Sequence, residues 1–355
     1  MVQPVLFSDS VQRSLRELPV IGVQRDITYY GTYAKGVLND PVATGMPYWS
    51  INPYMGCAFG CAYCYARYAH RYVMERATQA ETLVGASSES MAHMPPWLAF
   101  ERHILVKRNA PDVLARALRH GGEKHRRLLE GQAILIGTAT DPYQPAERAF
   151  RITRRILEVL LEHPGLTLGL VTKSPLITRD VDLLSRLARR SRLSIRLSLI
   201  TLDRPLARRL EPRAPTPESR LRALERLRQA GVDVGVNCMP VLPGITDDPR
   251  GLEALVRRVA DAGATSVGVC ALRLQHEARQ RYLPFIEAEF PHLAERYRAA
   301  YAHDTHMPAE YRDRLAQYVA SLCRKYGIAA REDRPEPPVS QAPAASAAPQ
   351  LELSL

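Results

Sequence analysis

Long hydrophobic runs are missing from this sequence of 355 residues. No stretch approaches the ~18 consecutive apolar residues that a membrane-spanning helix needs. The first residues also lack a basic segment followed by an apolar run and a small-residue cleavage site, so we expect no secretory signal. We therefore expect a cytoplasmic protein with reduced thiols, in which clustered cysteines indicate metal binding or catalysis more often than disulfides.

Lysine is also scarce, since only five of the 48 basic residues are lysine. Arginine supplies the rest, and the formal net charge is +11 with a pI near 9.5. This charge permits attraction to nucleic acid. It is equally compatible with a moderately basic enzyme that binds no polyanion, because a GC-rich genome also favours arginine.

A fourth clustered cysteine is absent as well. Cys57, Cys61 and Cys64 lie within eight residues of the segment "NPYMGCAFGCAYCYARYAH", and the next cysteine is Cys238. A structural zinc site needs four ligands, and His70 is the one substitute nearby. Three cysteines in a tight loop instead favour a [4Fe-4S] cluster, in which each thiolate holds one iron and the fourth iron stays open. Zinc or incidental cysteines remain the alternatives.

Apolar runs and amphipathic segments alternate through the middle of the chain, which predicts a parallel sheet with helical crossovers. The expected strands are 133–140, 166–174, 193–201, 232–244 and 265–274, with a first strand near 48–52. The expected helices are 146–162, 176–189, 217–230 and 249–262, the third ending at Gly231. About six β/α units are fewer than the eight of a closed barrel, so we predict a partial (β/α)6 barrel of the α/β class.

Four regions follow from this pattern. Residues 1–45 form an N-terminal extension on the surface, and residues 46–275 form the core barrel. Residues 276–330 are helical and rich in aromatics, and we expect them to pack against the open side of the barrel. Residues 331–355 are rich in Pro, Ala and Ser, which predicts a disordered tail.

The cysteine triplet, with Tyr63 just before its last cysteine, resembles the signature of the radical S-adenosylmethionine superfamily. The segments "TATDPYQPAE", "LVTKSPLITRDVDLL" and "PVLPGITD" narrow the resemblance to the spore photoproduct lyase-like branch, over about residues 48–275. The resemblance implies a [4Fe-4S] cluster, S-adenosylmethionine, a 5′-deoxyadenosyl radical and a reductase or flavodoxin-type electron donor.

The resemblance also assigns cofactor-binding residues. Lys173 matches the lysine that contacts the carboxylate of the cofactor, and Ser198 and Thr140 stand where hydroxyls help to hold it. Tyr63 would pack near the adenine, and Asp141 would bind the ribose or orient its loop. The alternative is that Lys173 ends a strand and the hydroxyls bond to local backbone.

One position departs from the family pattern. Thr138 stands where the lyase has the cysteine that returns a hydrogen atom to the product radical. Cys238 and Cys270 are candidate replacements, although each is also typical of a small buried core residue. We therefore do not expect the thymine-dimer reaction of the lyase. In "EPRAPTPESR", Glu211 and Arg213 could form a buried pair that stabilises a loop or could help to shape the mouth of the active site; because of the three prolines we interpret the segment as structural.

The last six residues, Gln350 to Leu355, read "QLELSL". They resemble the short motifs with which bacterial polymerases and repair proteins bind the DNA sliding clamp. Three functions remain open: a radical enzyme for DNA repair or nucleic-acid modification, a radical enzyme on a small molecule or peptide, and a non-catalytic iron–sulfur electron carrier or sensor.

Overall fold

The computed structural model describes residues 19–69, 94–119 and 122–331. His70 and the Gln350–Leu355 motif, both singled out from the sequence, lie outside the described residues. Within the described ranges, every helix is too short or too polar to span a bilayer.

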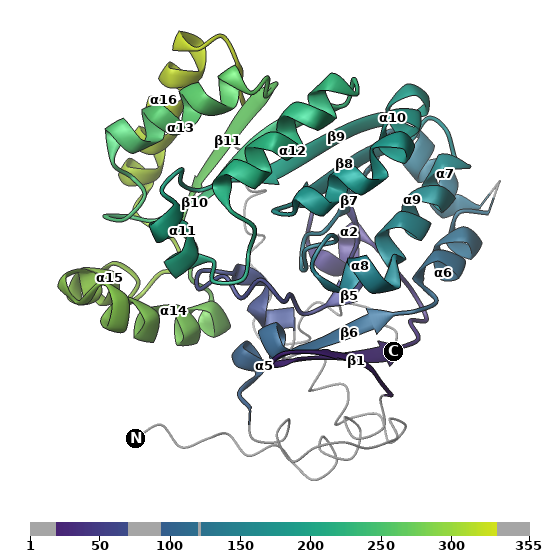
Figure 1. The fold of residues 1–355 in the computed structure, drawn as a ribbon, viewed down its shortest axis with the longest axis horizontal. Helices are drawn as coiled ribbons and strands as arrows, with labels where there is room; N and C mark the ends of the chain where they lie inside the picture. Colours follow the sequence, from purple (N-terminus) through teal and green to yellow (C-terminus); the bar gives the residue numbers. More distant parts are fainter. Residues whose placement is uncertain (1–18, 70–93, 120–121, 332–355) are drawn as a thin grey trace.

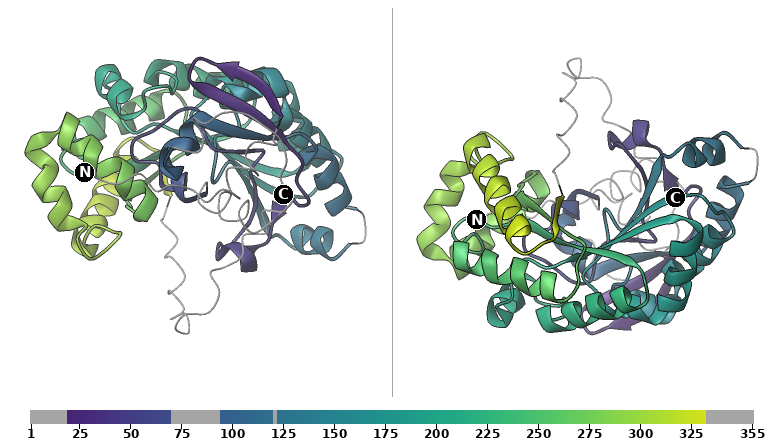
Figure 2. Two further views of the ribbon diagram at one scale, coloured as in Figure 1. Left: turned by 90° about the horizontal axis from the view of Figure 1, so that it is seen from below. Right: turned by 90° about the horizontal axis from the view of Figure 1, so that it is seen from above.

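An eight-stranded sheet forms the centre of the molecule, in the order β12-β11-β10-β9-β8-β7-β4-β3. Neighbours from β4 to β12 are parallel, and β3 pairs antiparallel with β4. The strands are β3 (Leu38–Asn39), β4 (Trp49–Ile51), β7 (Ala133–Ile136), β8 (Thr167–Thr172), β9 (Arg192–Ser198), β10 (Asp233–Val241), β11 (Ser266–Ala271) and β12 (Ala329–Arg331). The sheet curves, but its edge strands β3 and β12 do not pair, so the predicted partial barrel is confirmed (Figure 2).

Helices cover the convex side of this sheet (Figures 1 and 2). They are α8 (Ala146–Phe150), α9 (Ile152–Leu161), α10 (Val181–Arg190), α12 (Pro217–Gln229) and α13 (Pro249–Asp261). Alternation along β9 explains the packing, because Leu193, Ile195 and Leu197 are buried in the apolar core. The residues between them belong to the concave face.

Two predicted helices differ in detail from the observed ones. The segment 146–162 divides into α8 and α9 because Arg151 adopts a left-handed conformation with φ 53°. The segment 176–189 starts with a 3₁₀ turn, Pro175–Asp180, before α10 begins. Gly231, with φ 77°, follows the end of α12 as predicted.

Residues 19–45 of the predicted N-terminal extension contain regular structure. They supply β1 (Val20–Gln24) and β2 (Ile27–Thr32) to a second sheet of order β1-β2-β6-β5, with β5 (Tyr54–Met55) and β6 (His103–Lys107). Tyr29 and Tyr30 of β2 are buried. The remaining helices in this half are α2 (Pro41–Thr44), α5 (Pro96–Arg102), α6 (Ala110–Ala117) and α7 (Glu123–Leu129).

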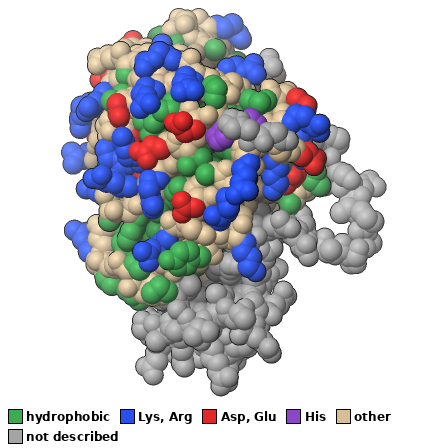
Figure 3. Space-filling view, turned by 90° about the vertical axis from the view of Figure 1, so that its right-hand side faces the viewer, with side chains coloured by type: hydrophobic (Ala, Val, Ile, Leu, Met, Phe, Trp, Pro, Cys, Tyr) green, Lys and Arg blue, Asp and Glu red, His purple; other side chains and the backbone are tan. Residues whose placement is uncertain are grey.

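The C-terminal region is helical, as predicted, and has two parts. Helices α14 (His276–Glu289) and α15 (Ala294–Ala300) pack with α5 and the cysteine segment in a second apolar cluster. Helix α16 (Ala309–Lys325) packs on α13 and β11, and Arg331 ends β12 rather than starting a tail. On the face formed by the outer helices, basic side chains are numerous and are mixed with acidic and apolar ones (Figure 3).

Candidate active site

The three predicted cluster ligands lie in one loop that follows β5. Cys57 and Cys61 are buried, and Cys64 is half-buried. Gly56 and Gly60 have φ values of 85° and 66°, a conformation that glycine adopts without strain. The loop therefore turns back on itself and holds all three thiols in a short stretch of backbone.

One side of the cysteine loop is fixed by the polar segment after β7. The Gln144 amide donates to the Gly56 carbonyl at 3.1 Å and accepts from the Ala58 amide at 2.9 Å. The Thr140 hydroxyl donates to the same Gly56 carbonyl at 2.6 Å. Gln144 and Thr140 are both buried. Thr140, predicted to hold the cofactor carboxylate, thus supports the loop through its hydroxyl, and its contact with the cofactor stays a prediction.

The other side of the loop is fixed by two arginines. Arg67 is fully buried, donates to the Cys61 carbonyl at 2.8 Å and pairs with Glu101 at 2.7 Å. Arg213 donates to the Ala58 carbonyl at 2.6 Å. A Cβ at Gly60 would lie 2.6 Å from Arg213 Nη2, so this position needs glycine for space as well as for its φ.

The chemistry of the thiols fits an iron–sulfur cluster. Burial raises the pKa of Cys57 to about 12, aided by Asp141 and Cys64, so an uncoordinated thiol there is protonated at neutral pH. A cationic iron centre would supply the charge that holds the thiolate. Each thiolate of such a cluster binds a different iron, so the three cysteines need not share one ion.

A buried charged group lies next to this loop. Lys173 Nζ is 5.7 Å from the centroid of the Tyr63 ring and 3.9 Å from Glu211 Oε1. Tyr63 donates its hydroxyl to Glu211 Oε1, and Arg220 donates to Glu211 Oε2. Arg220 also donates to the Ser198 carbonyl at 3.0 Å. Three elements far apart in the sequence thus meet at the carboxyl ends of β8 and β9.

The electrostatics keep this group ionised. Burial lowers the pKa of Lys173, but Cys61 and Glu211 raise it by more, so the net pKa is raised. Burial raises the pKa of Glu211, but Arg220 and Lys173 more than reverse this, so the net pKa is lowered. A lysine held cationic beside a cysteine loop can bind a carboxylate.

Asp141 lies beyond the carboxyl end of β7 and Ser198 lies at that of β9, and these two strands flank β8. Asp141 accepts hydrogen bonds from the Thr172 hydroxyl at 2.7 Å, the Lys173 amide at 2.7 Å and the Tyr143 amide at 2.9 Å. These contacts orient the loop, which is one of the two roles expected for Asp141. Ser198 is buried at the end of β9, and its carbonyl anchors Arg220.

The two candidate hydrogen donors separate clearly. Cys238 is 1% exposed and belongs to the apolar core between sheet and helices. Cys270 is half-buried on the neighbouring strand β11. Of the two thiols, Cys270 is therefore the more accessible.

The interpretation of Glu211 and Arg213 as a pair was wrong. Glu211 instead pairs with Arg220, and Arg213 contacts the cysteine loop and Glu101. Gln144, Arg67 and Arg220 were missed altogether. Their sequence signal is weak, because a buried arginine and a surface arginine on a helix look alike until the fold places them.

Comparison with protein families places these residues in a known context. The family model of the radical SAM superfamily matches residues 51–255. The "Uncharacterized protein Rv2578c" of Mycobacterium tuberculosis is 33% identical over 318 residues, which are 89% of this chain and 86% of that protein. The "Uncharacterized protein MJ0683" of Methanocaldococcus jannaschii is 28% identical over 60% of this chain and 68% of its own.

Solved structures show a similar fold. Spore photoproduct lyase complexed with dinucleoside spore photoproduct superposes with a TM-score of 0.60 at 16% identity, over 89% of this chain and 86% of that chain. A variant of that lyase with bound AdoMet and the same dinucleoside gives 0.55 at 16% identity, over 79% and 75% of the two chains.

Proposed function

This chain belongs to the radical SAM superfamily, and from that membership we propose that it is a radical enzyme acting on nucleic acid. Cys57, Cys61 and Cys64 would hold a [4Fe-4S] cluster, and Lys173 would bind the carboxylate of S-adenosylmethionine. When bound, these cofactors supply an electron and a 5′-deoxyadenosyl radical that takes a hydrogen atom from the substrate. A reductase or flavodoxin-type protein would deliver the electron.

The position of Lys173 carries the proposal. An iron–sulfur electron carrier has no need for a cofactor-carboxylate site, whereas a radical enzyme needs a cation beside the cluster loop. Lys173 lies half-buried between Cys61 and Glu211, and the negative charge of these groups raises its pKa there. Glu211 also pairs with Arg220, so one carboxylate faces two cations and the group can accept a further anion such as the cofactor carboxylate.

The chain's own residues have distinct roles in this scheme. Glu211 fixes both the Lys173 ammonium and the Tyr63 hydroxyl, and Arg220 balances the charge of Glu211. Gln144 and Arg67 hold the backbone of the cysteine loop from opposite sides. The burial of Tyr63 excludes water from this side of the loop.

The nucleic-acid substrate is supported by the net charge of +11 and by the fold shared with a lyase solved with a dinucleoside. A small molecule or a peptide is the alternative substrate class. The thymine-dimer reaction is not part of the proposal, because Thr138 replaces the cysteine that the lyase uses.

The test is anaerobic. The cluster is reconstituted and reduced, S-adenosylmethionine is added, and 5′-deoxyadenosine is measured by mass, with Cys61→Ala as the control. Deoxyadenosine from the native protein and none from the variant supports the radical chemistry, and DNA is then the first substrate class to assay. A fully loaded cluster without cleavage would favour the carrier or sensor.

The C-terminal motif suggests a partner at the replication fork. We propose that Gln350–Leu355 binds the DNA sliding clamp, with the glutamine in a polar notch and the leucines in an apolar cleft. A labelled peptide of this sequence should bind a bacterial clamp in fluorescence anisotropy. A peptide with alanine at Leu353 and Leu355 should not bind, and equal binding by both would contradict the proposal.

A further inference from the structure

The concave face of the main sheet carries polar side chains that extend from the predicted cofactor residues toward the amino ends of the strands. Ser194, Arg196 and Ser198 alternate along β9 with leucine and isoleucine residues that belong to the apolar core. The strand register places Ser198 beside Asn237. The same row continues through Gly268 to Arg331. A ligand on this face therefore meets polar groups from β9 to β12.

Arg196 lies flat against the sheet in the next row down. Its register partner on β10 is Gly235. A Cβ at Gly235 would lie 2.9 Å from Arg196 Cζ and 2.6 Å from Ser266 Oγ, so a larger residue would displace the guanidinium. Arg196 Nη1 donates to Ser266 Oγ. The guanidinium is thus fixed by a hydrogen bond to the neutral Ser266 hydroxyl, and it fits there because residue 235 is a glycine.

Arg331 brings a second positive charge to the same place. Arg331 packs over Gly268, since a Cβ there would lie at an ordinary contact distance of 3.5 Å from Arg331 Cδ. Burial and the charge of Arg331 together lower the pKa of Arg196, while Asp233 opposes them. Asp233 also accepts a hydrogen bond from the Thr265 hydroxyl at 2.6 Å. Among the described residues, no carboxylate is close enough to either arginine to form an ion pair with it.

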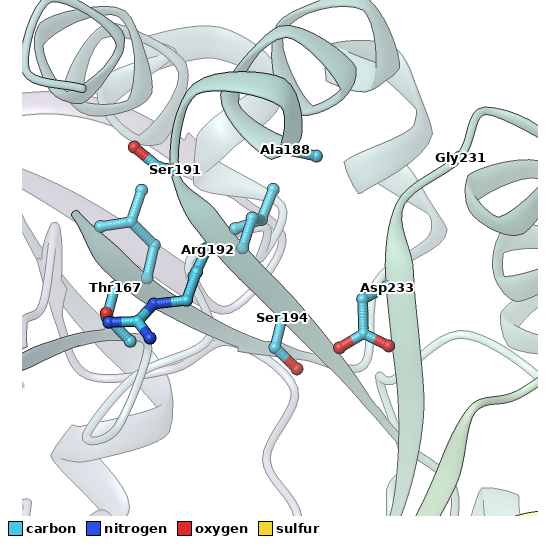
Figure 4. A pocket seen from close by; sticks show the side chains of 9 residues that line it. Thr167, Ala188, Ser191, Arg192, Ser194, Gly231 and Asp233 are labelled. Atoms are coloured by element: carbon cyan, nitrogen blue, oxygen red, sulfur yellow. The ribbon is translucent and has the colours of Figure 1, made fainter. Parts of the chain in front are cut away.

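The surrounding groups are also open to a ligand. Asn237 Oδ1 and Ser194 Oγ are buried atoms without a hydrogen-bond partner in the part of the chain that the structure describes. A separate hollow of about 410 Å³ lies at the amino ends of β8, β9 and β10, lined by Thr167, Arg192 and Asp233 together with Ala188 and Ser191 at the end of α10 (Figure 4). Buried polar groups usually have partners, so this part of the concave face is suited to a polar ligand.

We propose that Arg196 and Arg331 form a subsite for a phosphate group of a nucleotide substrate, directly below the S-adenosylmethionine site. This inference rests on the proposed function. Two guanidinium groups with one nearby carboxylate leave an excess positive charge, and planar guanidinium donors match phosphate oxygens in pairs. Ser198 is two residues from Arg196 on the same face of β9, so the phosphate would lie one step from the cofactor.

The test compares two probes on the reconstituted protein with S-adenosylmethionine bound. One probe is the dinucleotide TpT, and the other is its uncharged methylphosphonate analogue. We expect the native protein to bind TpT at least about tenfold more tightly, the scale of a charged hydrogen bond. Arg196→Gln and Arg331→Gln should each reduce this preference severalfold or more. Arg196→Lys should retain part of it, and circular dichroism checks that each variant folds.

Arg189→Gln is the matched control, because Arg189 is an exposed arginine of α10 on the outer side. It should keep the full preference for TpT. An unchanged preference in Arg196→Gln, or none in the native protein, would overturn the subsite. So would a comparable loss of S-adenosylmethionine affinity in Arg196→Gln, because the arginine would then serve the cofactor. The yield of 5′-deoxyadenosine without substrate tests the proposed function separately.

Discussion

The Lys173 ammonium lies 3.9 Å from the Glu211 carboxylate, and Arg220 donates to the other oxygen of the same carboxylate. One anion thus serves two cations, the buried Arg220 and the half-buried Lys173, with the Tyr63 hydroxyl as a further donor. This arrangement connects the strand ends that face the cysteine loop. This charged group is stable only when every member is present, because a buried charge that loses its partner does not gain hydration by water instead.

Glu211→Gln should therefore destabilise the protein by about 3–5 kcal/mol, because it leaves the buried Arg220 without a counter-charge and removes the partner of the half-buried Lys173. Urea unfolding measures the change. The control is Glu289→Gln, which removes the exposed partner of Arg209 at 2.9 Å and should cost under about 1 kcal/mol. Equal effects of the two variants would show that the Glu211 group contributes no more than a surface pair.

Lys173→Met should weaken S-adenosylmethionine binding by about 10- to 100-fold, since a charge-assisted bond to the cofactor carboxylate is lost. Equilibrium binding to the reconstituted protein is the measurement, with iron content as the check that the cluster is loaded. Lys325→Met, on the exposed side of α16, is the control and should bind normally. Unchanged affinity in Lys173→Met would rule out the carboxylate contact.

The sequence was enough to predict the parallel strands with helical crossovers, the open barrel and the place of Lys173 at a strand end. Spacing and apolar runs report these features directly, because they are local. The partner of Glu211 was not predictable in this way. Arg220 lies among several arginines of α12, and only the packing of that helix on the sheet makes it 2% exposed.

The N-terminal strands were missed for a related reason. Strand β2 is buried along almost its whole length, so it shows no alternation of apolar and polar residues. Strand β1 directly precedes β2, but the other partner of β2, strand β6, lies far along the chain. The loop contacts of Gln144 and Arg67 also depend on tertiary structure, since each binds backbone atoms that carry no sequence signal.

His103 predicts a dependence of stability on pH. Burial and, to a lesser extent, Arg102 lower its pKa from 6.5 to about 4, and Tyr30 contacts its Nδ1 at 3.3 Å. Between these two pH values the unfolded chain binds a proton that the folded chain does not, so stability falls as pH decreases. The loss from this group should be up to about 3 kcal/mol. Urea unfolding from pH 7 to pH 4 measures it.

The matched variant is His103→Gln, which cannot take up a proton. It should show a shallower decline of unfolding free energy between pH 6.5 and pH 4 than the native protein. Glu211 affects stability at lower pH. Its pKa is depressed in the folded protein, so its stabilisation is complete above the unfolded value of 4.5 and is lost as the pH falls through the folded pKa. Parallel pH profiles for native protein and His103→Gln would show that His103 is not the group responsible.

Gly60→Ala should impair assembly of the cluster loop through two separable effects. The φ of 66° costs about 1–2 kcal/mol for a residue with a Cβ. In addition, that Cβ would lie 2.6 Å from Arg213 Nη2 and push away the arginine that holds the Ala58 carbonyl. Gly45 has the same φ of 66°, but a Cβ there would meet no atom within 4 Å, so Gly45→Ala carries the backbone cost alone. Iron bound per protein after reconstitution should fall in Gly60→Ala and stay near the native value in Gly45→Ala. A similar iron content in both variants would show that the contact between Arg213 and the loop is dispensable for cluster binding.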